Sequence, residues 1–360
     1  MFCKVALLPG AGLGSIGPGA LVPFCPWDAE QLACHPDRKD IVRCRLYRSG
    51  AAGMRSNGSM RYWMGRDIHG GHMQGFYINL DSQPERRARI EQQIFTHGLA
   101  GRMTRVAAME GGASRADRAK VTPGEVGCFH SHLAALKLAR AADGQAMIIE
   151  DDAMLSAAYT TFALHSFTTK IFDTFDIVFT DVILQPELAV LHYLKRALED
   201  ALSLRDRNNV FMPRVLDISR RTFSAAASYL VAPRALDKLI RILEEECAVG
   251  PRMPFDLFLR AAAKQGLFRV ACVAPFLTSV YLEDVGATTI ENRERHAGNP
   301  TVLAAALLRY AFFIDSDIDG YARPFLDRIP WPHPTPCGDT RFDMVMKLIA
   351  FMLSDKYASF

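Results

Sequence analysis

The sequence predicts an α/β protein in which helices cover a sheet of buried strands. Residues 146–149 form a short apolar run without polar alternation, which is typical of a strand buried on both faces. Residues 75–80 and 225–231 are strand-like runs followed by helix-start signals. This alternation of strand and helix indicates βα units.

Composition excludes several classes of protein. The 360-residue chain has room for one large or two modest domains, and 49% hydrophobic residues against 22% charged ones indicate that most of it is globular. The formal net charge is only +3 and the basic residues are scattered, which argues against a nucleic-acid partner. The eight cysteines form no CxxC pair, which argues against a zinc ribbon or a secreted disulfide scaffold and favours a reducing compartment.

No transmembrane helix is expected. The apolar stretch 302–314 is shorter than a membrane span and contains Arg309. The N-terminus is a poor match to a signal peptide because its few apolar residues give way to glycines and prolines.

Residues 1–74 differ in texture from the rest and are expected to be an irregular or disordered extension, for which an upstream translation start is a plausible source. They include Gly12, Gly14 and Gly17 in the spacing of a dinucleotide-binding loop. That motif needs a helix at the pyrophosphate, and Pro18, Gly19 and Pro23 occupy the place of that helix, whose interior tolerates neither proline nor glycine well. A nucleotide site is therefore not expected there.

The first predicted βα unit starts at residue 75. Asp81 or Ser82 is expected to cap a helix that has Pro84 in its first turn and continues to about Phe95. Arg86 in this helix could face anionic phosphates or simply belong to a solvated face.

Residues 105–111 are a second predicted strand, and a capping box follows it. Thr122 is the expected N-cap, Pro123 occupies the first helical position, and Glu125 reaches back to the cap. The helix has an apolar stripe of 3.6-residue period. His132 in this helix is a candidate ligand contact, although a hydrogen-bonded structural histidine explains it as well.

Three consecutive carboxylates, Glu150, Asp151 and Asp152, end the apolar run at 146–149. In open α/β sheets ligands bind beyond the carboxyl ends of strands. A hard divalent cation would relieve the repulsion among the acids and hold substrate phosphates, whereas the alternative is a solvated acidic turn. Asp181 ends a similar run at 175–181 and faces the same edge or forms a turn.

Later elements are also readable. A strand at 225–231 precedes a helix at 233–246, a second helix starts near residue 254, and a last strand covers 268–273. Asp256 lies in the first turn of the second helix, where the helix dipole favours an acid even without chemistry.

The order of these pieces resembles glycosyltransferase family 25, the lipooligosaccharide galactosyltransferase-like group. Four blocks carry the resemblance, and weaker agreement continues to about residue 279. The blocks are Tyr77-Ile78-Asn79-Leu80 with Pro84-Glu85-Arg86-Arg87, Ala107-Ala108-Met109-Glu110-Gly111, Gly124-Glu125-Val126-Gly127-Cys128-Phe129-His130-Ser131-His132, and Ile148-Ile149-Glu150-Asp151-Asp152.

The resemblance implies a GT-A-like, Rossmann-type mixed sheet flanked by helices. It also implies a UDP-sugar donor, typically UDP-galactose, and a Mn2+ or Mg2+ ion. The expected reaction transfers the sugar with inversion to a saccharide or glycolipid acceptor of lipooligosaccharide or lipopolysaccharide. The expected location is cytoplasmic, on the inner side of a bacterial envelope pathway, with peripheral contact to the inner membrane as a further expectation.

Site roles follow from the resemblance and the chemistry together. Departure of UDP leaves negative charge that a carboxylate-held cation stabilises, and inversion calls for a base that deprotonates the acceptor. The expected metal ligands are Asp152 and Glu150; the expected donor-binding residues are Asn79, Arg86, His132, Glu150 and Asp151; and the expected base is Asp256, with Glu125 as its rival.

The predicted catalytic domain covers 75–283, between the extension 1–74 and a partly helical C-terminal extension 284–360. In the last, an apolar helix at 342–353 either docks on the domain or rests on a membrane surface. Two other functions compete with the transferase. A metal-dependent phosphohydrolase would need more ligands than one acidic triplet, and a non-catalytic sugar- or nucleotide-binding protein would keep the fold without turnover.

Overall fold

A computed structural model gives the arrangement of these elements. It describes residues 41–42, 73–111, 120–142, 144–208, 211–285, 300–329 and 344–349. The Gly12–Gly17 motif and most of the predicted extension lie outside the described residues, although Ile41–Val42 form an edge strand, β1.

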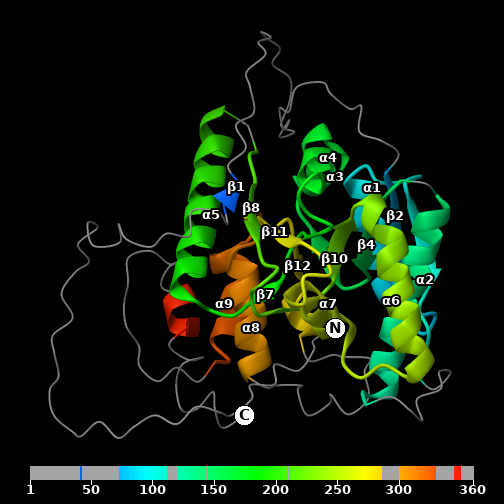
Figure 1. Ribbon diagram of the computed structural model, residues 1–360. Coiled ribbons are helices and arrows are strands. Elements are labelled where there is room, and N and C mark those ends of the chain that lie inside the picture. The colour runs from blue at the N-terminus through cyan, green and yellow to red at the C-terminus, as the bar shows by residue number, and fades with distance from the viewer. Residues whose placement is uncertain are drawn as a thin grey trace, which may run out of the picture.

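One mixed sheet of eight strands organises the described part of the chain, in the order β1-β8-β11-β6-β10-β4-β2-β3 (Figure 1). Strands β2, β3 and β4 are parallel, and β10 runs antiparallel to both β4 and β6. Strands β2, β4 and β6 therefore point the same way. The strands after β1 are β2 (Met73–Asn79), β3 (Met103–Ala107), β4 (Gln145–Glu150), β6 (Ile177–Phe179), β8 (Arg214–Asp217), β10 (Ser228–Val231) and β11 (Val270–Ala274).

Two small two-stranded sheets accompany the main one. Strand β5 (Ala153–Leu155) pairs with β12 (Thr278–Val280), and β7 (Ile183–Leu184) pairs with β9 (Phe223–Ser224). Each pair joins segments that lie far apart in the sequence. The first strand of each pair, β5 or β7, follows a strand, β4 or β6, that ends at the carboxyl edge of the main sheet.

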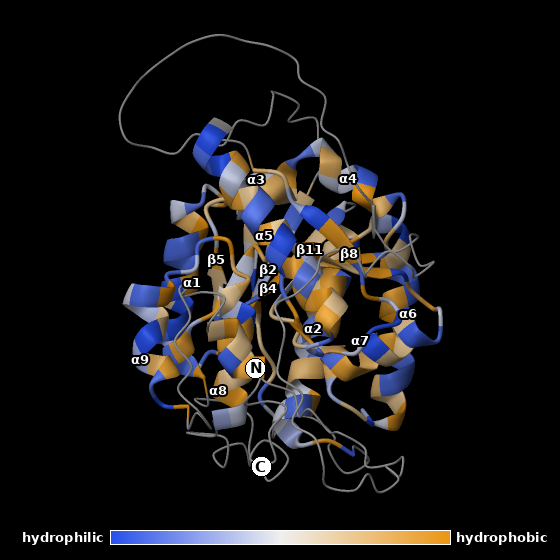
Figure 2. Cartoon of the chain, turned by 90° about the vertical axis from the view of Figure 1, so that its left-hand side faces the viewer, coloured by the Kyte–Doolittle hydropathy of each residue, from blue (hydrophilic) through white to orange (hydrophobic). Residues whose placement is uncertain are grey.

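Helices flank the sheet, as the α/β prediction requires. Helix α2 packs on β2 and β4 and against α6, while α5 packs on β11 at the opposite side of the molecule (Figure 1). Figure 2 shows outer helices that carry both hydrophilic and hydrophobic residues, as expected where one face meets the core. The helices are α1 (Pro84–Thr96), α2 (Pro123–Ala141), α3 (Tyr159–Leu164), α4 (Ser166–Phe172), α5 (Leu188–Asn208), α6 (Pro233–Val249), α7 (Phe255–Lys264), α8 (Pro300–Ala311) and α9 (Arg323–Leu326).

The predicted buried strand is confirmed, because every residue of β4 is buried. The capping box is confirmed as well: the Thr122 side chain accepts from the Glu125 amide and the Glu125 carboxylate accepts from the Thr122 amide. The predicted cap of α1 was wrong. Gln83 is the N-cap without a side-chain bond, and Asp81 forms an ion pair with Arg105 instead.

Two close backbone approaches fix the loop after β3 against α2. A Cβ on Gly127 would lie 2.4 Å from the Met109 carbonyl oxygen, and one on Gly111 would lie 2.4 Å from the Pro123 carbonyl carbon. The Met109 amide also donates to Ser131 Oγ at 2.8 Å. Glycine at these two positions therefore allows the loop to dock on the helix.

The end of the chain packs on the domain where it is described. Residues 344–349 are helical, and Met344, Val345 and Leu348 are buried. These contacts favour the docked helix over a membrane-bound one. Among the described residues, no helix combines the length and the apolar character needed to span a bilayer.

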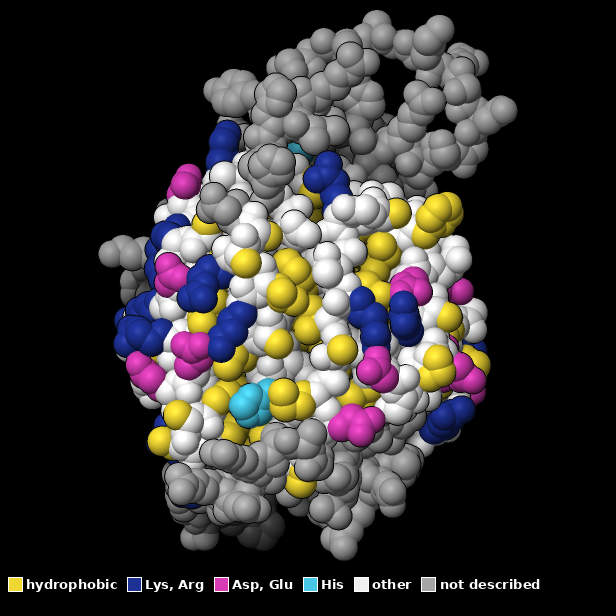
Figure 3. All heavy atoms as spheres, turned by 90° about the vertical axis from the view of Figure 1, so that its right-hand side faces the viewer, with side chains coloured by type: hydrophobic (Ala, Val, Ile, Leu, Met, Phe, Trp, Pro, Cys, Tyr) yellow, Lys and Arg dark blue, Asp and Glu magenta, His cyan; other side chains and the backbone are white. Residues whose placement is uncertain are grey.

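Charge on the surface is mixed on the face shown in Figure 3, where basic and acidic side chains alternate around apolar ones. The described residues on this face form no concentrated basic patch of the kind that binds nucleic acid.

Candidate functional site

The carboxyl edge of the sheet gathers the polar strand ends. Asn79 ends β2, Glu150 ends β4 with Asp151 and Asp152 directly after it, and Asp181 follows β6. Because these three strands point the same way, their ends lie along one edge, where α/β proteins bind ligands. The expectation that Asp181 faces this edge is confirmed.

Asp151 joins the first βα unit to the acidic triplet. Its Oδ2 accepts a 2.7 Å hydrogen bond from Asn79 Nδ2, and its Oδ1 lies 3.8 Å from Arg86 Nη1. Arg105 Nε donates to Asn79 Oδ1 at 3.1 Å and so orients the amide. Burial and the negative charge of Asp152 raise the pKa of Asp151 to about 6, although Asn79 and Arg86 oppose this rise.

Arg86 links this group to the segment after β12. Its Nε lies 4.0 Å from Asp284 Oδ2, and Asp284 also pairs with Arg89. The Arg89 guanidinium stacks on the Tyr281 ring at 3.9 Å from the centroid. The start of α1 is thus held to residues 281–284, which places two guanidinium groups beside the acidic edge.

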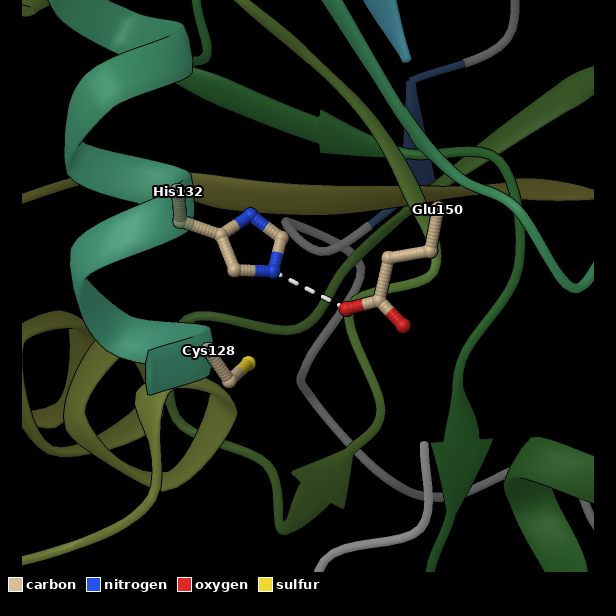
Figure 4. Close-up of side chains that lie close together, drawn as sticks. All are labelled: Cys128, His132 and Glu150. Carbon is tan, nitrogen blue, oxygen red and sulfur yellow. Dashed lines mark hydrogen bonds and ion pairs between the residues drawn. The ribbon is translucent and has the colours of Figure 1, made fainter. Parts of the chain in front are cut away.

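Glu150 points to a different partner from Asp151. Its Oε1 lies 2.9 Å from Nε2 of His132, which comes from α2 (Figure 4). The other ring nitrogen, Nδ1, lies 3.0 Å from the Tyr229 hydroxyl of β10. Burial raises the pKa of Tyr229, so this hydroxyl stays protonated and can act as donor or acceptor.

The imidazole of His132 is held firmly. Its ring stacks on Phe255 with centroids 4.0 Å apart and planes 2° from parallel, and only 1% of the residue is exposed. Cys128 lies one helical turn earlier on the same face of α2 (Figure 4). The possible ligand atoms of Cys128, His132 and Glu150 all lie within 4.8 Å of one another.

Asp152 and Asp181 lie deeper in the edge. Asp152 is only 5% exposed. Burial raises the pKa of its carboxyl, while the positive charges of Arg86 and Arg309 lower it. Asp181 is fully buried and forms an ion pair with Arg309 of α8, whose side chain is 2% exposed. Burial raises the pKa of Asp181 even though Arg309 opposes the shift.

The two candidate bases make structural contacts. Asp256 accepts hydrogen bonds from the amides of Ala225 and Leu257, both at 2.8 Å. Ala225 has φ of 72°, an unfavourable backbone conformation for alanine, so the hydrogen bond that its amide donates to Asp256 stabilises a strained backbone. Glu125 caps α2. The catalytic role of either residue stays a prediction.

Sequence reasoning missed several residues of this edge. Arg105, Asp284 and Arg309 carry no local signal, since each reaches the edge from a distant segment. Cys128 had one, because a cysteine four residues before a histidine in a helix lies on the same face.

Comparison with known proteins agrees with the resemblance in the sequence. A family model described as glycosyltransferase family 25 (LPS biosynthesis protein) matches residues 72–259. No curated protein matches the chain. The match covers β2 through the first half of α7 and therefore includes Asn79, the acidic triplet and Asp256, whereas Asp284 and Arg309 lie beyond it.

Proposed function

Because the chain belongs to glycosyltransferase family 25, a family of LPS biosynthesis proteins, we propose that it transfers a sugar from a UDP-sugar to a saccharide acceptor of lipopolysaccharide or lipooligosaccharide. Galactose is the proposed sugar, and the proposed reaction is metal-dependent and inverts the anomeric centre. Transferase chemistry in LPS biosynthesis follows from the family, whereas the donor, the stereochemistry and the cation are proposals.

One observation carries the proposal for the donor site: Asn79 and Arg86 both contact Asp151 at the carboxyl edge. A strand end, the first turn of a helix and a carboxylate pair together supply what a nucleotide diphosphate requires. Arg86 offers a guanidinium for phosphate oxygens, Asp151 or Glu150 offers an acceptor for ribose hydroxyls, and Asn79 positions Asp151. His132 is hydrogen-bonded to Glu150, and its proposed place in the donor site is through that carboxylate.

The residues at the edge fit a hard divalent cation. Asp151 and Asp152 are adjacent carboxylates with little exposure, and they provide the oxygen ligands that Mg2+ and Mn2+ prefer. Asp152 is the proposed direct ligand, with Glu150 or Asp151 assisting. A bound cation would act as a Lewis acid that stabilises the charge on the departing diphosphate.

The acceptor hydroxyl needs a base on the face of the sugar opposite to UDP. Asp256 is the proposed base and Glu125 the rival. Asp256 lies next to Phe255, which stacks on His132, so it belongs to the same end of the domain as the acidic triplet.

UDP release by the full chain from a panel of UDP-sugars, with Mn2+ and then with EDTA, tests the proposal. Donor hydrolysis at a low rate reveals a transferase without its acceptor. We expect release from UDP-galactose that EDTA abolishes. Release from another UDP-sugar alone would overturn the choice of galactose, and release that EDTA leaves unchanged would overturn the metal.

Asp152→Asn is the decisive variant, and Asp237→Asn on the exposed face of α6 is its matched control. We expect the first to abolish turnover while the circular dichroism spectrum is unchanged, and the second to behave as wild type. A wild-type protein that binds UDP-sugars by calorimetry and never turns them over would instead be a binding protein on the same fold.

A further inference from the structure

We propose that Cys128, His132 and Glu150 form a second cation site, which binds a thiophilic divalent ion such as zinc. This site is separate from the oxygen-lined site proposed for the donor cation. It assigns Glu150 to the second ion and leaves Asp151 and Asp152 to the first. The inference depends on the geometry of the three side chains and does not require the proposed transferase activity.

The three side chains converge from two elements. Cys128 and His132 lie four residues apart on α2, and Glu150 ends the neighbouring strand β4 (Figure 4). Their ligand atoms lie within 4.8 Å of one another. Two ligands about 2.0 to 2.3 Å from a tetrahedral ion lie roughly 3.4 to 3.6 Å apart. Small side-chain rotations that move the ligand atoms by about an ångström therefore bring all three to bonding distance.

The donor set selects the class of ion. One sulfur, one imidazole nitrogen and one carboxylate oxygen are the ligand types that zinc binds in proteins. Mg2+ and Mn2+ prefer oxygen ligands and gain little from a thiolate. With three protein ligands, a tetrahedral ion keeps a fourth position for water or another ligand. Cys128 is partly buried while His132 and Glu150 are buried, so the cysteine forms the more exposed side of the site.

The surroundings of His132 match those of a metal-bound histidine. Its Nδ1 has a partner in the Tyr229 hydroxyl at 3.0 Å, and Phe255 fixes the plane of the ring. When Nε2 binds an ion, Nδ1 keeps the proton and donates a hydrogen bond to the Tyr229 hydroxyl. Such a second partner sets the tautomer and direction of a ligating histidine.

Charge also favours an ion at this position. His132 is 1% exposed and Glu150 is 9% exposed, so the carboxylate lies in a region of little water. A thiolate and a carboxylate together compensate the two positive charges of the ion. The bound ion would tie the first half of α2 to the end of β4, one residue before the donor-site carboxylates begin.

Without an ion, the same contacts form a hydrogen-bonded relay in which Tyr229 donates to His132 and His132 donates to Glu150. The hydrogen bonds of the relay need no thiolate, whereas the ion site requires the Cys128 thiolate. Cys128 therefore distinguishes the two arrangements, and Cys247 on α6, which is likewise partly buried and outside any disulfide, provides the matched control.

Cobalt is the spectroscopic probe, because a thiolate bound to Co2+ gives a charge-transfer band in the near ultraviolet. The full chain is stripped with a chelator and titrated with Co2+, and zinc retained after dialysis is measured by mass spectrometry. We expect about one equivalent of zinc and a cobalt–thiolate band in wild type. Cys128→Ser should lose both, and Cys247→Ser should keep both.

A wild-type protein without the cobalt band, or a Cys128→Ser protein that binds both ions as wild type does, would overturn the site. The subtraction of Cys128→Ser from wild type also removes the contribution of cysteines elsewhere in the chain. None of these readouts uses UDP-sugar turnover, so failure of this site and failure of the proposed activity are separate results.

Discussion

Replacing Arg309 by methionine removes the positive charge that faces the buried carboxylate of Asp181 and keeps a side chain of similar length. The two side chains are 2% and 0% exposed, so water cannot take over the role of the lost guanidinium. Breaking a buried pair by removing one partner costs about 3–5 kcal/mol of stability, because the other charge stays buried without compensation. We therefore expect Arg309→Met to lower the free energy of unfolding by about that amount.

The double variant Asp181→Asn/Arg309→Met tests the cause. With both charges gone, no uncompensated ion is buried, and much of the loss should be regained. We expect the double variant to be more stable than the sum of the single effects predicts, by at least about 1 kcal/mol. Partial recovery of this kind identifies the buried charge, and not lost packing alone, as the source of the cost.

An exposed ion pair is the control for the charge itself. Lys195 and Glu199 form an i,i+4 pair on α5 with side chains 36% and 54% exposed, and such pairs contribute at most about 0.5 kcal/mol. Urea unfolding of the full chain, followed by circular dichroism, measures all the variants. The reasoning fails if Arg309→Met is no more destabilising than Lys195→Met, or if the single effects simply add.

Three further variants test other parts of the structure. Gly127→Ala should destabilise the protein by roughly 1–3 kcal/mol in urea unfolding, because its Cβ would meet the Met109 carbonyl oxygen; a gain, as at an ordinary helical glycine, would contradict the close approach. Asn79→Ala should weaken UDP binding measured by calorimetry through loss of its bond to Asp151, and unchanged affinity would remove Asn79 from the donor site. Asp256→Asn should lower kcat by about 10²-fold or more if Asp256 is the base, whereas a loss of stability at full kcat would leave it only a structural role.

Local chemistry in the sequence was sufficient for much of the fold. The capping box at Thr122 and Glu125 is read from neighbouring residues, and the uninterrupted apolar run before Glu150 identifies a strand buried on both faces. Both depend on interactions within a few residues of the chain. The same information places Asn79, Glu150 and Asp181 at strand ends, which puts them at one edge once the strands are known to run the same way.

Other elements were not predicted, for reasons that are also physical. The polar, arginine-rich residues around 205–208 are the last turn of α5, whose 21 residues begin at Leu188 without a clear start signal. The two-residue strands β7 and β9 are too short to show any period, and they exist only because each pairs with the other.

The sequence by itself therefore determined the fold class, the carboxylate-rich strand end and the family to which the chain belongs. Only the tertiary structure decided which carboxylate faces which partner: Asp151 meets Asn79 and Arg86, while Glu150 meets His132. It also brought Arg309 to Asp181 across 128 residues of chain. Periodicity and capping report contacts within a turn or a strand, whereas these pairings arise only when β2 pairs with β4, α2 packs on β4 and α8 packs against β7 and β12.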